Sequence, residues 1–272
     1  MQSSNPVFAR SEGFNGRGGT AYADFGAGAP ITHTQPGTGR MTIDTVVQKT
    51  GVTLGIVVLA AAATWLLTGD IVDQTTQQVN TDVASQLYTI SLVGALGGFA
   101  LSLVNSFKRA ISPALVIAYA ALEGLFVGAF SKVVGQWVGD SVVVGAVLGT
   151  VAAVAGTLAA YKFFDIQVNN KFRTWVIGAM FGFVAVSLLD MVLGFFHADF
   201  GFNGFGGMGL VSSIIGLGIG VLMLILDFDF VERGIAAGLP ERESWRAAFG
   251  LTVTIIWIYI ELLRLLAILR GD

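Results

Sequence analysis

The sequence contains no cysteine, only two histidines and few charged residues. The lack of cysteine excludes disulfides, thiolate metal sites and cysteine nucleophiles. His33 and His197 are too few for a histidine metal cluster. Charged residues make up 12% of the chain, whereas a soluble domain carries about 25%. A soluble fold this poor in charge could not cover its own surface, so the composition indicates a protein surrounded by lipid.

Sequence patterns of common enzymes are absent as well. The chain has no G-x-x-x-x-G-K-[ST], no H-E-x-x-H and no G-x-S-x-G. Its net charge of −3 gives no indication of nucleic-acid binding. We therefore expect no enzyme, no catalytic residue and no cofactor, and the composition leaves a metal site undefined.

Hydrophobic residues make up 54% of the chain and fall into seven long apolar runs. Each run is close to the ~20 residues that an α-helix needs to cross a bilayer. The sequence therefore predicts an all-α membrane protein with a seven-helix membrane domain at 46–270. The predicted helices span residues 46–68, 87–107, 114–135, 141–162, 173–196, 208–230 and 247–269.

Residues 1–45 differ from the rest because they are rich in glycine and poor in branched apolar side chains. Such a segment cannot bury enough surface to offset the entropy lost on ordering. It is not a signal peptide, since no apolar core follows the first residue within about 30 positions. We expect a flexible tail.

Lysine and arginine predict the orientation of the helices. They concentrate in the tail and in the connections after the second, fourth and sixth predicted helices. The alternate connections at 69–86 and 197–207 contain neither residue, and Lys132 is the exception near that face. The pattern predicts a cytoplasmic N-terminus and a C-terminus outside the cell.

Ionisable residues within the predicted helices are candidate functional residues, because each costs about 2.5–3.5 kcal/mol on insertion scales. They are Glu123, Asp190, Asp227, Asp229, Glu261 and Arg264. Asp190 and Arg264 lie at similar depth and could pair, and Glu261 is an i, i+3 neighbour of Arg264. These three form either a structural ion-pair cluster or an outer gate.

Two of these acids each allow two interpretations. Asp227 either extends to water from one turn inside a helix end or is a buried carboxylate that titrates near neutral pH. Asp229 follows at i+2 and so points away from it. Glu123 either is protonated within the bundle or lines a cation path, since carboxylate oxygens suit Ca²⁺.

Small residues recur at the four-residue spacing that lets membrane helices approach closely. The pairs are Gly94 and Gly98, Gly145 and Gly149, Gly178 and Gly182, and Gly216 and Gly220. Each pair predicts a close helix contact.

Three segments carry a resemblance to a known family. They are Glu123-Gly124-Leu125, the Asp227-containing end of the sixth predicted helix, and Tyr259-Ile260-Glu261-Leu262-Leu263-Arg264-Leu265-Leu266. With them, residues 46–270 resemble the Bax inhibitor-1 (transmembrane Bax inhibitor motif) family in its bacterial branch. The opening Ser3-Ser4-Asn5-Pro6-Val7-Phe8 looks like the actinobacterial members.

The resemblance implies six helices around a central seventh, and a pH-dependent calcium leak. In relatives, aspartates from the sixth and seventh helices sense pH, and a basic residue at the end of the second helix can pair with them. Asp227 matches the sixth-helix aspartate, with Asp229 as the fallback, and Lys108 or Arg109 would be the basic partner. Arg264 matches the seventh-helix arginine.

The seventh helix departs from the family at the second aspartate, whose position falls on Thr254. Threonine cannot carry a negative charge, so a two-carboxylate sensor is not expected here. Either Asp227 titrates alone against the basic partner, or Asp229 substitutes, or pH gating is weak.

Three hypotheses follow. The first is a cation leak across the bacterial plasma membrane, with calcium as the permeant ion and the buried acids as successive sites. The second is a regulatory membrane protein that acts through a membrane protein partner such as a protease, with the tail as its contact. The third is a proton-coupled transporter.

Overall fold

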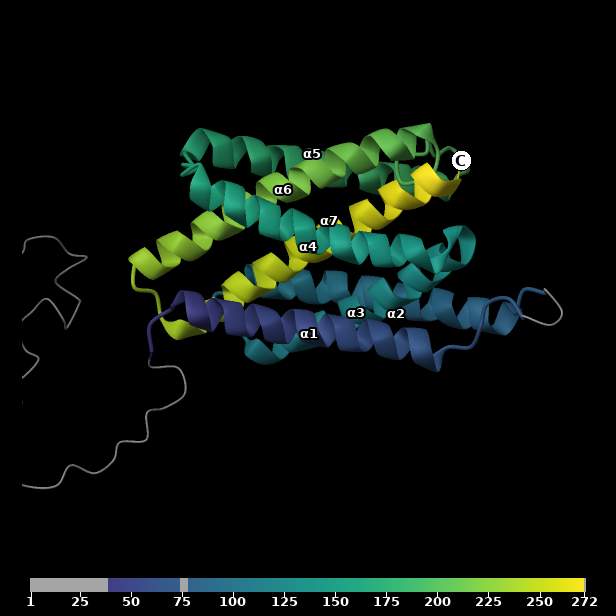
Figure 1. Cartoon of the computed structure of the whole chain (residues 1–272), viewed down its shortest axis with the longest axis horizontal. Helices are drawn as coiled ribbons and strands as arrows, with labels where there is room; N and C mark the ends of the chain where they lie inside the picture. The colour runs from purple at the N-terminus through teal and green to yellow at the C-terminus, as the bar shows by residue number, and fades with distance from the viewer. Residues whose placement is uncertain (1–38, 74–77, 272) are drawn as a thin grey trace, which may run out of the picture. The chain divides into compact units, whose positions relative to one another are not determined.

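The computed structural model describes residues 39–73 and 78–271, and within them lie seven long α-helices (Figure 1). The helices are α1 (Ile43–Leu67), α2 (Thr81–Phe107), α3 (Pro113–Val138), α4 (Asp140–Phe163), α5 (Asn170–Gly194), α6 (Gly207–Ala236) and α7 (Ser244–Gly271), with a 3-10 turn, η1 (Glu241–Glu243), before α7. All seven are long and apolar enough to cross a membrane. The predicted multi-pass, all-α membrane protein is confirmed. The flexible tail predicted for residues 1–45 lies, up to residue 38, outside the described residues.

Two helices extend six residues beyond one predicted end, further than the other five. α2 begins at Thr81 rather than residue 87, because the side chain of Asn80 accepts the backbone N–H groups of Asp82 and Val83 and caps a polar first turn. α6 continues to Ala236 rather than residue 230, and a left-handed Gly238 (φ +65°) follows its end. Hydropathy alone misses such polar helix ends.

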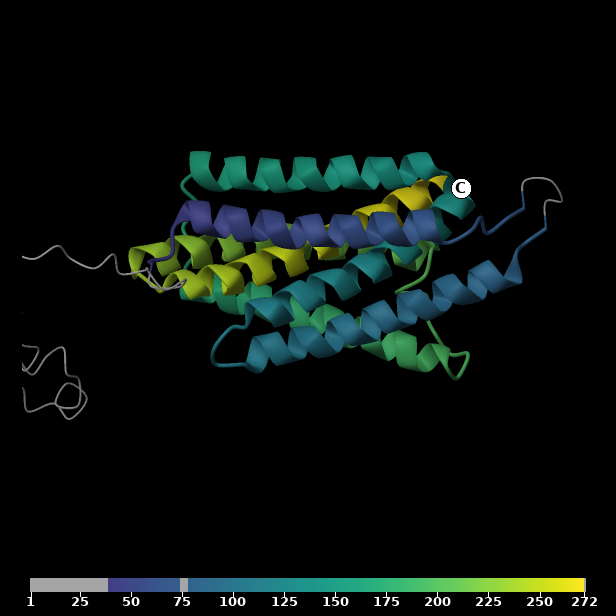
Figure 2. The ribbon, with the colours of Figure 1, turned by 90° about the horizontal axis from the view of Figure 1, so that it is seen from below.

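Helix α7 is the centre of the bundle. It packs against α1, α3, α4 and α6, whereas α2 lies on α3 and α5 lies on α6. In Figures 1 and 2, α7 runs obliquely between its neighbours. Of its apolar span, 61% is buried, against 17% for α1, α2 and α5. The central seventh helix is therefore present, with α1, α3, α4 and α6 packed along it, whereas α2 and α5 lie mainly on α3 and α6.

Three of the four predicted glycine pairs face a neighbouring helix. A Cβ atom on Gly94 would lie 2.7 Å from the Leu122 carbonyl oxygen of α3, and one on Gly216 would lie 2.7 Å from Oε1 of Glu261 on α7. The pair at 145 and 149 contacts leucines of α7 at 3.3–3.4 Å. The prediction is wrong for Gly178 and Gly182, which have no atom within 4 Å of such a Cβ.

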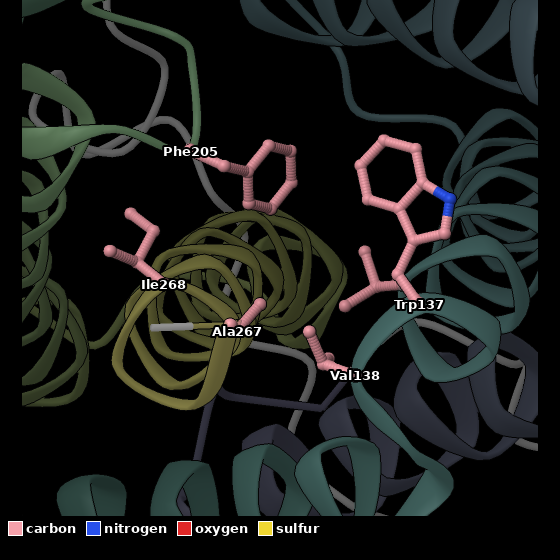
Figure 3. A pocket seen from close by; sticks show the side chains of 7 residues that line it. Trp137, Val138, Phe205, Ala267 and Ile268 are labelled. Carbon is pink, nitrogen blue, oxygen red and sulfur yellow. The ribbon is translucent and has the colours of Figure 1, made fainter.

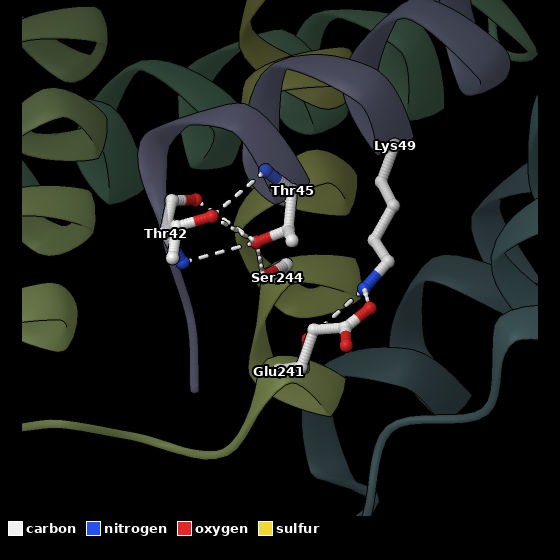
Figure 4. Close-up of polar contacts among 5 residues, drawn as sticks. All are labelled: Thr42, Thr45, Lys49, Glu241 and Ser244. Carbon is white, nitrogen blue, oxygen red and sulfur yellow. Dashed lines mark hydrogen bonds and ion pairs between the residues drawn. The ribbon is translucent and has the colours of Figure 1, made fainter. Parts of the chain in front are cut away.

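One end of the bundle holds most of the cations, and we call it the basic end; the opposite end is the far end. The basic end carries Lys49, Lys108, Arg109, Lys162, Lys171, Arg173, Arg233, Arg242 and Arg246. There the start of α1 is tied to the α6–α7 connection (Figure 4). Thr45 and Ser244 share a hydrogen bond of 2.8 Å, and Lys49 pairs with Glu241 at 2.8 Å. These contacts fix the start of α7 against α1.

The glycine contacts give a matched prediction. We expect Gly94→Ala to lower the unfolding free energy by about 1–3 kcal/mol, because its methyl group would meet backbone atoms of α3. Gly178→Ala should be neutral or stabilising, because its methyl group meets open space and alanine favours helix. Unfolding in mixed detergent micelles would measure both, and equal effects would contradict the assigned packing.

Candidate functional site

Polar side chains of α7 bond to three neighbouring helices, α1, α3 and α6. Thr252 bonds to Thr53 of α1 at 2.7 Å, and Tyr259 bonds to Ser131 of α3 at 2.7 Å. Other polar side chains of α7 face α6. Because lipid offers no hydrogen bonds, such groups must find partners inside the bundle. The candidate site is this row of buried polar groups around α7.

Asp227 lies at the contact between α6 and α7. The Thr254 hydroxyl donates a hydrogen bond of 2.6 Å to its Oδ2, and Gly250 lies beside its Oδ1. Since α6 ends at Ala236, Asp227 lies nine residues, or about 13 Å, inside the helix. The expectation that it lies one turn from a helix end is wrong, because charged residues extend α6 beyond its apolar run. Asp227 bonds to α7 within the bundle.

Thr254 occupies the position at which the family resemblance placed a second aspartate, and it faces Asp227 directly. The side chain is 6% exposed. A threonine hydroxyl can donate a hydrogen bond to a carboxylate, but it holds no charge of its own. The structure therefore brings together the two residues of the predicted pair as one carboxylate and one hydroxyl.

Asp229, the fallback residue, faces the other way. It is 6% exposed and accepts hydrogen bonds from Arg173 of α5 at 2.6 Å and from Arg233 of α6 at 2.9 Å. Arg233 also donates to the carbonyl oxygen of Val168 in the α4–α5 connection. Asp229 thus joins α5, α6 and this connection, and two cations already neutralise it.

The predicted basic partners of Asp227 lie elsewhere. Lys108 and Arg109 are exposed between α2 and α3, and neither forms an ion pair within the described part of the chain. Arg109 instead accepts a hydrogen bond from Arg246 through its carbonyl oxygen. The structure does not bring either side chain to Asp227, because α2 lies on α3 and does not pack on α6.

Glu123 lies at the contact between α2 and α3. A Cβ atom on Gly98 of α2 would lie 2.7 Å from its Oε1, so the absence of a side chain there makes room for the carboxylate. Tyr119 lies one turn before Glu123 on α3, and its hydroxyl lies beside the Glu123 carboxyl group. The ring of Tyr119 packs on Phe249 of α7 at 5.0 Å. Glu123 is thus linked to α7 through Tyr119.

Glu261 and Arg264 form a buried pair in the half of α7 nearer the far end. They are 5% and 8% exposed, and their nearest atoms are 3.4 Å apart. Arg264 donates to Ser213 at 2.6 Å and to Ser212 at 2.5 Å, both on α6. Oε2 of Glu261 is buried without a hydrogen-bond partner. The pair is therefore held to α6, but it is not fully satisfied.

Asp190 does not pair with Arg264, although the sequence allowed it. Within the described residues its carboxylate accepts backbone N–H groups, from Phe200 at 2.9 Å and from Asn203 at 2.8 Å. The α5–α6 connection folds inward, and its backbone N–H groups bond to the carboxylate that could have paired with Arg264.

Lys132 explains the exception in the charge pattern. Its ammonium donates to the carbonyl oxygens of Trp65 and Thr68 and to the Thr68 hydroxyl, at 2.7–2.9 Å. It thereby caps the last carbonyls of α1. The sequence did not predict this role of Lys132. It also did not predict that Ser212 and Ser213 accept hydrogen bonds from Arg264. In both cases the acceptors come from a part of the chain far away in sequence.

An apolar pocket lies at the far end, between α3, α7 and the α5–α6 connection (Figure 3). Its lining residues are Val134, Trp137, Val138, Phe205, Ala267, Ile268 and Gly271. It carries no titratable side chain and therefore offers no ion site. Among the described residues, no group of three or more His, Cys, Asp or Glu side chains could hold a metal ion.

Comparison with known proteins gives a match to one protein family. The model of the family described as Bax inhibitor 1 like matches residues 5–271, nearly the whole chain. No curated protein matches the sequence. The match includes every helix and all the buried acids described above.

The Asp227–Thr254 bond gives a matched prediction. Thr254→Val keeps the side-chain shape but leaves the Asp227 carboxylate without its donor, so the unfolding free energy should fall by about 1–3 kcal/mol. Thr254→Ser keeps the hydroxyl and should recover most of that loss. If both variants unfold alike in detergent, the hydrogen bond does not stabilise the α6–α7 contact.

Proposed function

The chain belongs to the Bax inhibitor 1 like family, and from that premise we propose that it mediates a pH-influenced leak of cations, calcium among them, across the bacterial plasma membrane. The observation that carries the proposal is the carboxylate of Asp227, which is half-buried and held by one hydroxyl at the contact between the central helix and α6. A charge at this depth is costly and is a mark of function.

Other buried acids support an ion path along α7. Glu261 lies seven residues beyond Thr254, or about 10 Å further along the same helix. Glu123 lies on α3, at its contact with α2. No second carboxylate lies beside any of these acids in the described part of the chain, whereas a tight calcium site needs six to eight oxygens. Isolated carboxylates suit brief binding and release, which conduction requires.

The charge distribution supports an orientation for this path. The basic end gathers lysine and arginine from the α2–α3, α4–α5 and α6–α7 connections, and we assign it to the cytoplasm. The far end, with Asp70, Asp82 and Asp199, would then face outward. Asp227 thus lies between the centre and the cytoplasmic side, and the Glu261–Arg264 pair lies in the outer half.

A single carboxylate at the α6–α7 contact changes how pH would act. With Thr254 as its partner, Asp227 has no second carboxylate with which to share a proton. The pH response would therefore follow the titration of one group and would be shallow. Regulation through a membrane protein partner remains the alternative, and the tail to which it pointed lies outside the described residues up to residue 38.

Flux measurements test the proposal. In calcium-loaded liposomes, we expect Glu123→Gln and Asp227→Asn each to reduce Ca²⁺ release by roughly threefold or more, because each removes one anionic site while keeping the side-chain shape. The amide oxygen introduced by Asp227→Asn can still accept the Thr254 hydroxyl, so the fold should be retained. Release would be recorded at several pH values from 5 to 8, against Na⁺ and K⁺.

Asp82→Asn is the matched control, because Asp82 is an exposed acid in the first turn of α2. It should leave release unchanged. Release that is the same in all three variants at every pH would overturn the proposed leak through the bundle.

A second carboxylate at residue 254 should steepen the pH response. In Thr254→Asp, two carboxyl groups would face each other across about 2.6 Å, the present oxygen–oxygen distance. At low pH a shared proton would hold α6 to α7; once both groups ionise at higher pH, their repulsion would separate the helices. Flux should therefore rise with pH in Thr254→Asp but not in the uncharged Thr254→Asn. A flat profile in both would exclude gating at this contact.

A further inference from the structure

The connection between α5 and α6, residues 195–206, folds back onto the bundle at the far end. Gly201 adopts a left-handed backbone (φ +79°), which reverses the chain between Phe200 and Asn203. The N–H groups of these two residues consequently point at the same buried carboxylate, that of Asp190. Asp190 is 3% exposed, so this anchor lies beneath the connection and away from solvent.

A second anchor lies one turn before Asp190 on α5. The Ser187 hydroxyl donates to the Asn203 side-chain oxygen at 2.5 Å, and the Asn203 side-chain nitrogen donates to the Ser187 carbonyl oxygen at 2.7 Å. Asn203 is therefore held by its backbone and by both ends of its side chain.

The third anchor joins the connection to α6 and to the central helix. Ser212 donates to the carbonyl oxygen of Phe202 at 2.5 Å, and the same hydroxyl accepts from Arg264. The ring of Phe202 packs on Phe183 at 5.0 Å, and Phe183 packs on Trp257 of α7 at 5.4 Å. The connection thus bonds to the serine that bonds to Arg264.

Beneath these anchors lies the Glu261–Arg264 pair. Ser212 and Ser213, which hold Arg264, are both fully buried. One turn beyond Arg264, Ile268 packs against Gly209 of α6 and lines the far-end pocket. The pocket thus reaches to within one helical turn of the Glu261–Arg264 pair. The α5–α6 connection lies over the remaining turn.

We propose that residues 200–204 form an outer lid, latched by Asp190, that separates the Glu261–Arg264 pair from the solution at the far end. Release of the latch would free the Phe202 carbonyl from Ser212 and open the space between α6 and α7 above Arg264. The lid regulates the ion path of the proposed function and rests on that function for its physiological meaning. Its existence as a cover is testable without any flux.

The absence of cysteine allows a direct test by single reporter residues. Ser213→Cys places a thiol beside Arg264 under the lid. In liposomes, a charged, membrane-impermeant thiol reagent should react slowly with this cysteine. Adding Asp190→Asn, which replaces one acceptor oxygen by a donor facing a backbone N–H, should raise the rate by about tenfold or more.

Asp199→Asn is the matched control, since Asp199 is an exposed acid of the same connection outside the latch. It should leave the Ser213→Cys reactivity unchanged. Ala198→Cys, in an exposed position, should react fast in every background, and Ala120→Cys, in the core, should stay unreactive. Fast reaction of Ala120→Cys would show unfolding, and the second measurement below would then decide.

Hydrogen exchange provides that second measurement without a reporter. The amides of Phe200 and Asn203 should exchange faster in Asp190→Asn than in the parent chain or in Asp199→Asn. The proposed lid is wrong if the Ser213→Cys thiol already reacts fast in the parent background. It is also wrong if Asp190→Asn changes neither the thiol reaction rate nor the amide exchange rate. If Asp190→Asn abolishes the protection of the thiol and the amides but no variant releases Ca²⁺, the lid is supported and the proposed leak is rejected.

Discussion

The constraint on which the structure depends is that polar groups within a bilayer find their partners inside the protein. The central helix, α7, satisfies this constraint through hydrogen bonds to three neighbouring helices. Its hydroxyl, indole and guanidinium groups each reach a different neighbour: Thr53 on α1, Ser131 on α3, and Asp227, Gly216, Ser212 and Ser213 on α6. An apolar helix could rotate or slide against lipid-like neighbours, whereas these bonds fix both the register and the rotation of α7.

The same constraint explains the glycines of α6. Gly216 and Gly220 lie where Glu261, Trp257 and Ile258 of α7 approach, and a side chain there would meet them at 2.7–3.0 Å. Removing side chains from one helix makes room for large or charged side chains on the other. Gly98 does the same for Glu123 at the α2–α3 contact. Each of these two acids, Glu261 and Glu123, is therefore accommodated by the glycine opposite it.

The sequence predicted the seven helices well, because apolar length is a direct consequence of bilayer thickness. It also placed Asp227 and Thr254 at one site through the family resemblance, and they are in contact. It failed where partners come from other helices or loops. Asp190 could not be assigned to the backbone of residues 200 and 203, because loop amides leave no mark in composition. Lys132 looked like a violation of the charge rule, since its three acceptors lie on α1.

The contact between α6 and α7 is unevenly satisfied along its length, and this decides where it can change. Toward the basic end, Asp227 has its donor in Thr254, and Asp229 on the reverse face of α6 has two arginines. Toward the far end, Oε2 of Glu261 accepts no hydrogen bond and has only the Arg264 guanidinium, 3.4 Å away, as a partner. A buried acceptor without a hydrogen bond costs about 1–3 kcal/mol. Opening the far half would return that oxygen to water, which offsets part of the loss of the bonds from Arg264 to Ser212 and Ser213. If the proposed ion path runs beside α7, we expect its first movement at the far end, next to Arg264, where the contact is less fully satisfied.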